Sequence, residues 1–218
     1  MKLKKLLALM VAAFTLIAAT SVSFATTTEP AKGTPGTESN PAQAAVGKLL
    51  QVPEGTTLDS NQSFTFSFAQ QTDVTLNDAS GHTIPITSTA VNIDPKSLTI
   101  KKNSTYQETA NGTTTYGAQT GNIFDGVTFP NAGVYAYKVT EDKPADATAN
   151  ENGSGTLIST ITQDGTKYKV TKQYSGAEYM MYVYVKNKED GSGTYVAAVG
   201  IEMTKGDGIP GTEGTEGT

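Results

Sequence analysis

The chain has 218 residues, of which 37% are hydrophobic, and its formal net charge is −5. All of its basic residues are lysines, so it lacks the guanidinium groups that usually read phosphates and base edges, which argues against nucleic-acid binding. It has no cysteine, which excludes disulfides and thiolate zinc sites, and its one histidine, His82, lies in a predicted loop. These features argue against an enzyme, and they give no reason to expect a metal or a cofactor.

The first 25 residues have the pattern of a secretory signal peptide. A start with three lysines is followed by an apolar run, residues 6–19, and by the small-x-small site Ser23-Phe24-Ala25. The apolar run is short for a membrane span. We therefore expect a secreted protein whose mature chain begins with a flexible leader, residues 26–45, rich in Thr, Pro, Gly and Ala. A similar low-complexity tail, residues 206–218, follows the globular region.

The globular region, residues 46–205, consists mainly of short alternating patterns that are typical of β-strands. The predicted strands are 46–52, 63–68, 126–129, 133–143, 168–170, 179–186 and 195–203, with weaker signals at 73–76, 90–93 and 98–101. Asp190-Gly191 marks a hairpin turn, and the polar stretches 108–122 and 144–155 are expected to be surface loops. This pattern predicts an all-β fold, an immunoglobulin-like sandwich with Greek-key connections.

Two predicted strands carry a charged residue in line with their apolar face. Glu141 has the same parity as Tyr137 in one strand, and Lys48 has the same parity as Leu50 in another. Taken singly, each is explained by an edge strand whose long side chain reaches solvent. Taken together they suggest a buried Lys–Glu pair, because a lone buried charge is costly.

Four segments in order carry a family resemblance. They are GKLLQVPEGTTL, which contains Lys48, then SFTFSF, then VTFPNAGVYAYKVTEDK, which contains Glu141, and finally YVYVKNKEDGSGTYVAAVGI. This order resembles the isopeptide-linkage domain of Gram-positive backbone pilins of the streptococcal type, and the resemblance covers most of the globular region. It implies an immunoglobulin-like sandwich in which a lysine of the first strand condenses with an asparagine of the last strand, assisted by an acid.

Carried over to this chain, the resemblance makes Lys48 the nucleophile and Glu141 the acid that shuttles the proton. Burial disfavours charge on both groups, so a neutral amine could attack a carboxamide carbon. The reaction would occur once per molecule, without turnover. The implied protein is a structural subunit of a cell-surface pilus on the cell wall, joined head to tail with other pilin subunits by a pilus sortase. The alternative is an adhesin or tip pilin that binds a host glycan or matrix protein through its loops.

The sequence departs from the family at the asparagine. Only low-complexity residues without asparagine follow the last predicted strand, so we expect the chain to stop before the final strand that carries the cross-link partner. Asn187, the last asparagine, is the in-chain candidate, and it could equally be a hairpin residue. Lys205 is a candidate acceptor for the sortase, although an ordinary solvated lysine is the favoured interpretation. Residues 209–213 (IPGTE) are not accepted as a sorting signal.

Overall fold

The computed structural model describes most of the chain as β-structure. The described residues are 8–18, 35–56, 58, 61–78, 80–101, 106–110, 112–151, 153–163 and 166–206. Within these ranges every regular element is a strand, which confirms the all-β prediction, and none is a helix that could cross a membrane. The predicted cleavage site, residues 26–34 of the leader and the IPGTE segment lie outside the described residues.

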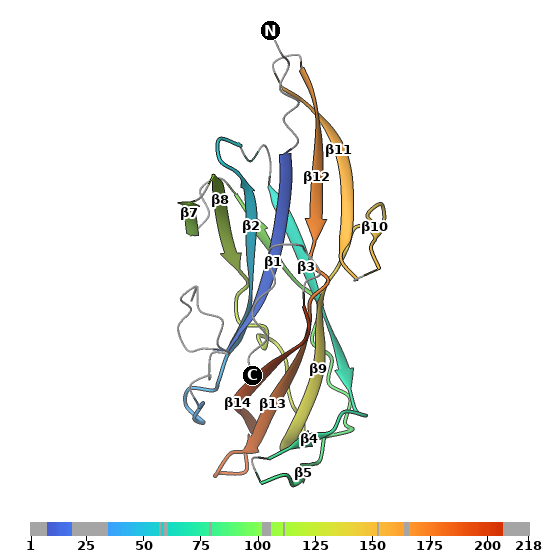
Figure 1. Cartoon of the computed structure of the whole chain (residues 1–218). Helices are drawn as coiled ribbons and strands as arrows, with labels where there is room; N and C mark the ends of the chain where they lie inside the picture. The colour runs from blue at the N-terminus through green and yellow to red at the C-terminus, as the bar shows by residue number, and fades with distance from the viewer. Residues whose placement is uncertain are drawn as a thin grey trace.

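A seven-stranded sheet forms the upper part of the elongated molecule in Figure 1. In spatial order its strands are β10 (Thr148–Ala149), β11 (Gly155–Gln163), β12 (Thr166–Tyr174), β1 (Ala8–Ala18), β2 (Ala44–Pro53), β8 (Thr113–Gln119) and β7 (Tyr106–Ala110). Neighbouring strands are antiparallel except β1 and β12, which are parallel. The strand nearest the N-terminus therefore lies in the middle of this sheet, between β12 and β2.

A five-stranded antiparallel sheet extends into the lower part of the molecule (Figure 1). In spatial order its strands are β14 (Thr194–Lys205), β13 (Glu178–Asn187), β9 (Gly133–Glu141), β3 (Gln62–Gln71) and β6 (Lys96–Ile100). A two-stranded ribbon, β4 (Leu76–Asn77) with β5 (Thr83–Ile84), lies at the lower end. The β13–β14 hairpin turns at Gly191, whose φ of 71° is readily adopted only without a side chain.

One buried apolar cluster joins the two sheets. Leu50 of β2, Phe66 of β3, Tyr137 of β9 and Met181 of β13 are each 0% exposed and belong to it. The strand β3 alternates between buried and more exposed positions, as expected where one face of a sheet meets a core. The central strands β9 and β13 instead contain runs of four buried residues, because a second apolar cluster packs on their other face (Val134, Ala136, Met180 and Tyr182). The Tyr137 hydroxyl donates a hydrogen bond to the Val91 carbonyl at 3.0 Å, which satisfies its polar end within the core.

Several segments differ from the sequence-based expectation. The strand β11 was not predicted, β10 lies in the predicted loop 144–155, and of the predicted strand 73–76 only Leu76 belongs to a strand. Three further differences are explained by local contacts. The predicted loop 108–122 largely forms the β7–β8 hairpin, because its β-branched threonines suit a strand and β8 gains a ladder with β2. Residues 126–129 form no strand: Gly126 has a φ of 80° in a turn. Residues 90–93 form none either, and there the Gln70 side chain takes the place of a neighbouring strand, accepting from the Val91 N–H at 2.8 Å.

Buried tyrosines predict a loss of stability at alkaline pH. Burial raises the pKa of Tyr174 from 10.0 to about 12 and also raises the pKa of Tyr137. The unfolded chain therefore loses these protons at lower pH than the folded chain does. The stabilisation is fully present below pH 10.0 and is lost as pH rises toward about 12. Urea unfolding across this range should show a falling midpoint, and the Tyr174→Phe variant should show a smaller fall.

Candidate functional site

The candidate site lies in the core between the two sheets, and its two charged residues come from the middle of one strand and the end of another. Lys48 lies in the middle of β2 and is 0% exposed, and Glu141, the last residue of β9, is 3% exposed. In the ladders, Lys48 lies across from Ala118 of β8 and Glu141 across from Phe66 of β3. The two charged residues thus come from opposite sheets and point into the same interior.

The structure brings Lys48 and Glu141 into direct contact. The Lys48 ammonium Nζ donates to Glu141 Oε2 at 2.7 Å, with both side chains fully buried. The backbone N–H of Ser175, between β12 and β13, donates to the same oxygen at 2.9 Å. Among the described residues, the other carboxyl oxygen, Oε1, is buried and has no hydrogen-bond partner. The site therefore has one satisfied oxygen and one that is open to a donor.

The electrostatics favour a carboxyl group that can carry a proton. Burial raises the pKa of Glu141, while the charge and hydrogen bond of Lys48 and the N–H of Ser175 oppose this rise. Burial has the larger effect because a carboxylate loses its hydration in the core. Glu141 therefore holds a proton to higher pH than an exposed glutamate does, as a general acid requires.

A second lysine, which the sequence analysis missed, lies beside this pair. Lys172 of β12 is half-buried, and its Nζ donates to Gln62 Oε1 at 3.0 Å. It lies 4.5 Å from the centroid of the Phe64 ring, and Lys48 Nζ lies 4.7 Å from the same centroid. Burial lowers the pKa of Lys172, and the charge of Glu141 opposes this. The parity of Lys172 with Tyr174, which is buried, is the signal that could have identified it.

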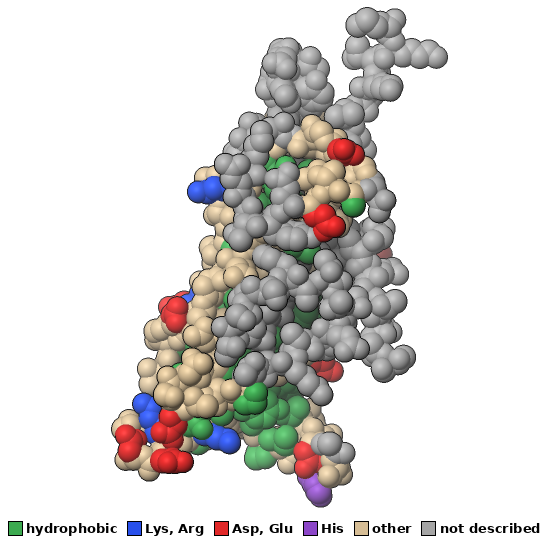
Figure 2. Space-filling view, turned by 90° about the vertical axis from the view of Figure 1, so that its left-hand side faces the viewer, with side chains coloured by type: hydrophobic (Ala, Val, Ile, Leu, Met, Phe, Trp, Pro, Cys, Tyr) green, Lys and Arg blue, Asp and Glu red, His purple; other side chains and the backbone are tan. Residues whose placement is uncertain are grey.

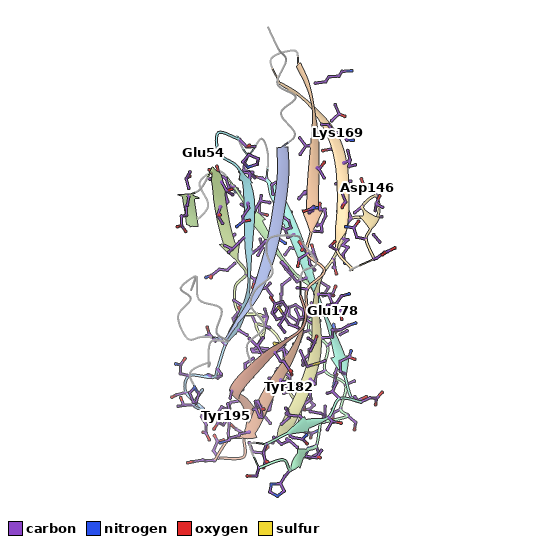
Figure 3. All side chains as sticks on the ribbon, in the orientation of Figure 1. Glu54, Asp146, Lys169, Glu178, Tyr182 and Tyr195 are labelled. Atoms are coloured by element: carbon purple, nitrogen blue, oxygen red, sulfur yellow. The ribbon has the colours of Figure 1, made fainter. Side chains whose placement is uncertain are left out.

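Asn187 lies far from the Lys48–Glu141 pair. Glu178, at the start of β13, pairs with the neighbour of Glu141 in β9, whereas Asn187 is the exposed last residue of β13. At the rise of an extended strand the two ends of β13 are about 30 Å apart. In Figure 3, Glu178 lies in the middle of the molecule, while Tyr195, next to the partner of Asn187, lies near its lower end. Within this fold Asn187 does not reach Lys48.

Lys205, the candidate sortase acceptor, lies in a surface ion-pair group. It is the last residue of β14, its side chain is 42% exposed, and its Nζ is 3.6 Å from Glu178. Lys138 approaches the same carboxylate at 3.5 Å. Ion pairs of this kind contribute little to stability, so the Lys205 amine can leave its partner at small cost.

The apolar segment of the predicted signal peptide forms β1 beside the site. Phe14 is its residue across from Lys48, and Met10 is its residue across from Lys172. The β1 sequence, ALMVAAFTLIA, contains neither a carboxamide nor an acid. It completes the backbone ladder next to the lysines but has no group that could react with an amine.

Other sequence features do not add a second site. The His82 side chain is 81% exposed at the β4–β5 tip, and its Nδ1 lies 3.2 Å from the Asp78 carboxylate; it is the purple side chain of Figure 2. In the part of the chain that the structure describes, no three His, Asp or Glu residues are grouped as metal ligands.

Two comparisons with known proteins were negative. A scan against protein-family models finds no match, and a search of curated proteins finds no similar sequence. The site is therefore interpreted from its own residues: a buried amine, a buried carboxyl group with one open oxygen, and a second lysine on the same aromatic ring.

Proposed function

We propose that the chain is a structural subunit of a cell-surface pilus whose domain forms an autocatalytic Lys–Asn isopeptide cross-link. The observation that carries this proposal is the contact between Lys48 and Glu141 at 2.7 Å inside an apolar core. A buried ion pair usually contributes little to the stability of the folded state, because the cost of desolvating the two charges offsets most of their attraction. A chemical role for the pair explains why both residues are placed there.

The proposed reaction follows from the two protonation states of the pair. Transfer of the ammonium proton from Lys48 to Glu141 leaves a neutral amine and a neutral carboxylic acid, which burial favours over two charges. The amine attacks the carboxamide carbon of an asparagine, the acid donates its proton to the departing nitrogen, and the carboxylate so formed takes up a proton from the attacking nitrogen. One C–N bond forms, one C–N bond breaks and ammonia leaves. The fold supplies the proximity that makes such a step fast without turnover.

The partner asparagine would come from a final strand of an immunoglobulin-like sandwich with Greek-key connections. Lys205, at the end of β14, pairs with Glu178 at the start of β13, and Glu178 also pairs with Thr140, the neighbour of Glu141. A strand that followed Lys205 would therefore begin close to the site. This placement supports a partner located beyond β14 in preference to Asn187.

The assembly part of the proposal rests on the sequence pattern. A signal peptide would direct export, and a pilus sortase would join the subunits head to tail at the cell wall. Head-to-tail contacts that do not close into a ring produce filaments.

The adhesin alternative would gain support from exposed aromatic side chains in the loops. Tyr116, one of its candidates, is 4% exposed and lies in β8, so this observation does not favour it.

The test of this function is the intact mass of the mature protein isolated from its own cells. We expect a mass lower by one ammonia than the sequence predicts, and unmodified masses for the Lys48→Ala and Glu141→Ala variants. Fragmentation should locate the bond at Lys48. An unmodified wild-type mass would exclude the cross-link, and a link at Lys172 would reassign the nucleophile.

A further inference from the structure

The leader contains a segment that docks on the edge of β14. We call residues 35–43 the leader clip; their composition predicts a flexible stretch, but the structure fixes them. The Gly36 N–H donates to the Ala197 carbonyl at 2.7 Å, and the Ala42 N–H donates to the Val196 carbonyl at 2.8 Å. Within the described sheets β14 is an edge strand that pairs only with β13 (Figure 1). The leader clip therefore covers part of a strand edge that has no ladder partner.

A bulge in β14 prepares its edge for this contact. Tyr184 of β13 lies across from Ala198, and Val185 lies across from Val196, so Ala197 is an extra residue without a counterpart. In a regular strand adjacent carbonyls point to opposite sides, whereas those of Val196 and Ala197 both accept from the leader clip. The bulge thus creates a pair of neighbouring acceptors that a regular strand edge lacks.

Two residues of the leader clip make this contact selective. A side chain at Gly36 would place its Cβ 2.6 Å from the Val196 carbonyl oxygen, so the close approach requires glycine. The Glu38 carboxylate accepts from the backbone N–H of Glu189, in the β13–β14 turn, at 2.7 Å. We call the two carbonyls of the bulge and this N–H the β14 site. It requires a glycine and, two residues later, a side-chain acceptor.

The sequence that fills the β14 site occurs a second time in the chain. Residues 35–38 of the leader clip read PGTE, and residues 210–213 of the low-complexity tail, outside the described residues, read PGTE as well. The repeat retains both the glycine and the glutamate that contact the β14 site. The buried Ala42 of the leader clip corresponds to Gly217 in the tail. The leader clip is therefore the stronger of the two ligands.

The tail copy does not reach the β14 site of its own chain. Ala197 and Lys205 are eight residues apart in extended β14, which corresponds to about 26 Å. Gly211 follows Lys205 by six residues, and the chain must first reverse its direction, which takes at least about two of them. The remaining four residues span at most about 14 Å. The β14 site within reach of a tail copy is therefore that of a second copy of the chain.

We propose that the β14 site is a docking site between subunits, which the leader clip occupies in the free chain and residues 210–213 of a second copy occupy in the assembled state. The β14 site and the tail lie at opposite ends of β14, so each subunit offers its tail to the next, in a contact that does not close on itself. The leader clip is then autoinhibitory, because it must leave before the next subunit docks. This docking is non-covalent and involves neither Lys48 nor Glu141; it takes from the proposed function only the mature start of the chain.

The first test measures the mass of the mature chain, from residue 26 onward, by light scattering over a range of concentrations. We expect the wild type to be monomeric, because its own leader clip has a high effective concentration at the β14 site. The Gly36→Ala variant, which expels the leader clip, should form oligomers that grow with concentration. Adding Gly211→Ala should restore the monomer. A monomeric Gly36→Ala variant would overturn the proposal, and so would a double variant that still associates, because the tail would then not be the ligand.

The second test examines the β14 site with a peptide. The Gly36→Ala, Gly211→Ala chain is labelled with ¹⁵N, and the amide signal of Glu189 is followed as the synthetic peptide IPGTEGTEGT, residues 209–218, is added. We expect this signal to shift, and to stay in place with a matched peptide that has alanine in place of Gly211. The wild-type chain, whose β14 site is filled, should require at least tenfold more peptide. If neither peptide shifts the signal, the docking proposal fails, whether or not the cross-link of the proposed function is found.

Discussion

In the chain that has not formed the cross-link, replacing Lys48 with methionine should lower the free energy of unfolding by about 3–5 kcal/mol, because it leaves a buried carboxylate without its charge partner. Glu141 would keep one hydrogen bond, from the Ser175 N–H, and its Oε1 is already without a partner among the described residues. The loss should shrink as pH falls, since burial raises the pKa of Glu141 and a protonated carboxyl group no longer requires the cation. Urea unfolding at neutral and acidic pH measures both effects.

Two variants control this experiment. The double variant Lys48→Met with Glu141→Leu removes both charges and should recover most of the lost stability, because well-packed apolar residues replace a buried pair at little cost. Lys138→Met breaks the exposed contact with Glu178, at 3.5 Å, and should change stability by less than about 1 kcal/mol. A double variant as unstable as the single variant would show that packing at Lys48, and not its charge, accounts for the loss.

The mature protein with its proposed Lys48 cross-link should be more stable than the unlinked Glu141→Gln variant by roughly 5 kcal/mol, which is the value that chain-entropy arguments give for closing a loop of more than about a hundred residues. The bond restricts the unfolded ensemble between Lys48 and its asparagine while leaving the strand ladders of the folded state in place. Chemical unfolding of the two proteins measures this difference. If the cross-linked protein and the Glu141→Gln variant unfold at the same denaturant concentration, the cross-link does not constrain the unfolded state as the loop argument requires.

The strand pattern and the charged pair could be predicted from periodicity. Alternation over 63–68 and 179–186 leads to β3 and β13, because a strand with one buried face repeats every two residues. The same rule singled out Lys48 and Glu141, which the structure then places 2.7 Å apart. Parity works here because both strands present one face to a single core.

The sequence-based predictions of strands and loops are wrong where contacts between distant segments outweigh the local pattern of polar and apolar residues. Residues 108–122 are polar and looked like a loop, but β8 is held by its ladder with β2. Residues 90–93 are apolar enough for a strand, and a side-chain amide from Gln70 takes the place of the strand partner. Lys172 shares the parity of its buried neighbour Tyr174, which Lys167 and Lys169 do not, but only the tertiary structure places it beside the Phe64 ring.

Periodicity in the sequence is enough to show that the chain is built of strands and that Lys48 and Glu141 lie on their inward faces, because side-chain direction in a strand is a local property. The folded chain was needed to show that the two residues meet, that Lys172 shares the Phe64 ring with Lys48, that Asn187 lies at the far end of β13, and that β1 lies between β2 and β12. These facts depend on which strands become neighbours. Which strands become neighbours depends on pairing and burial between segments far apart in the chain, and the periodicity of a single segment does not contain this information.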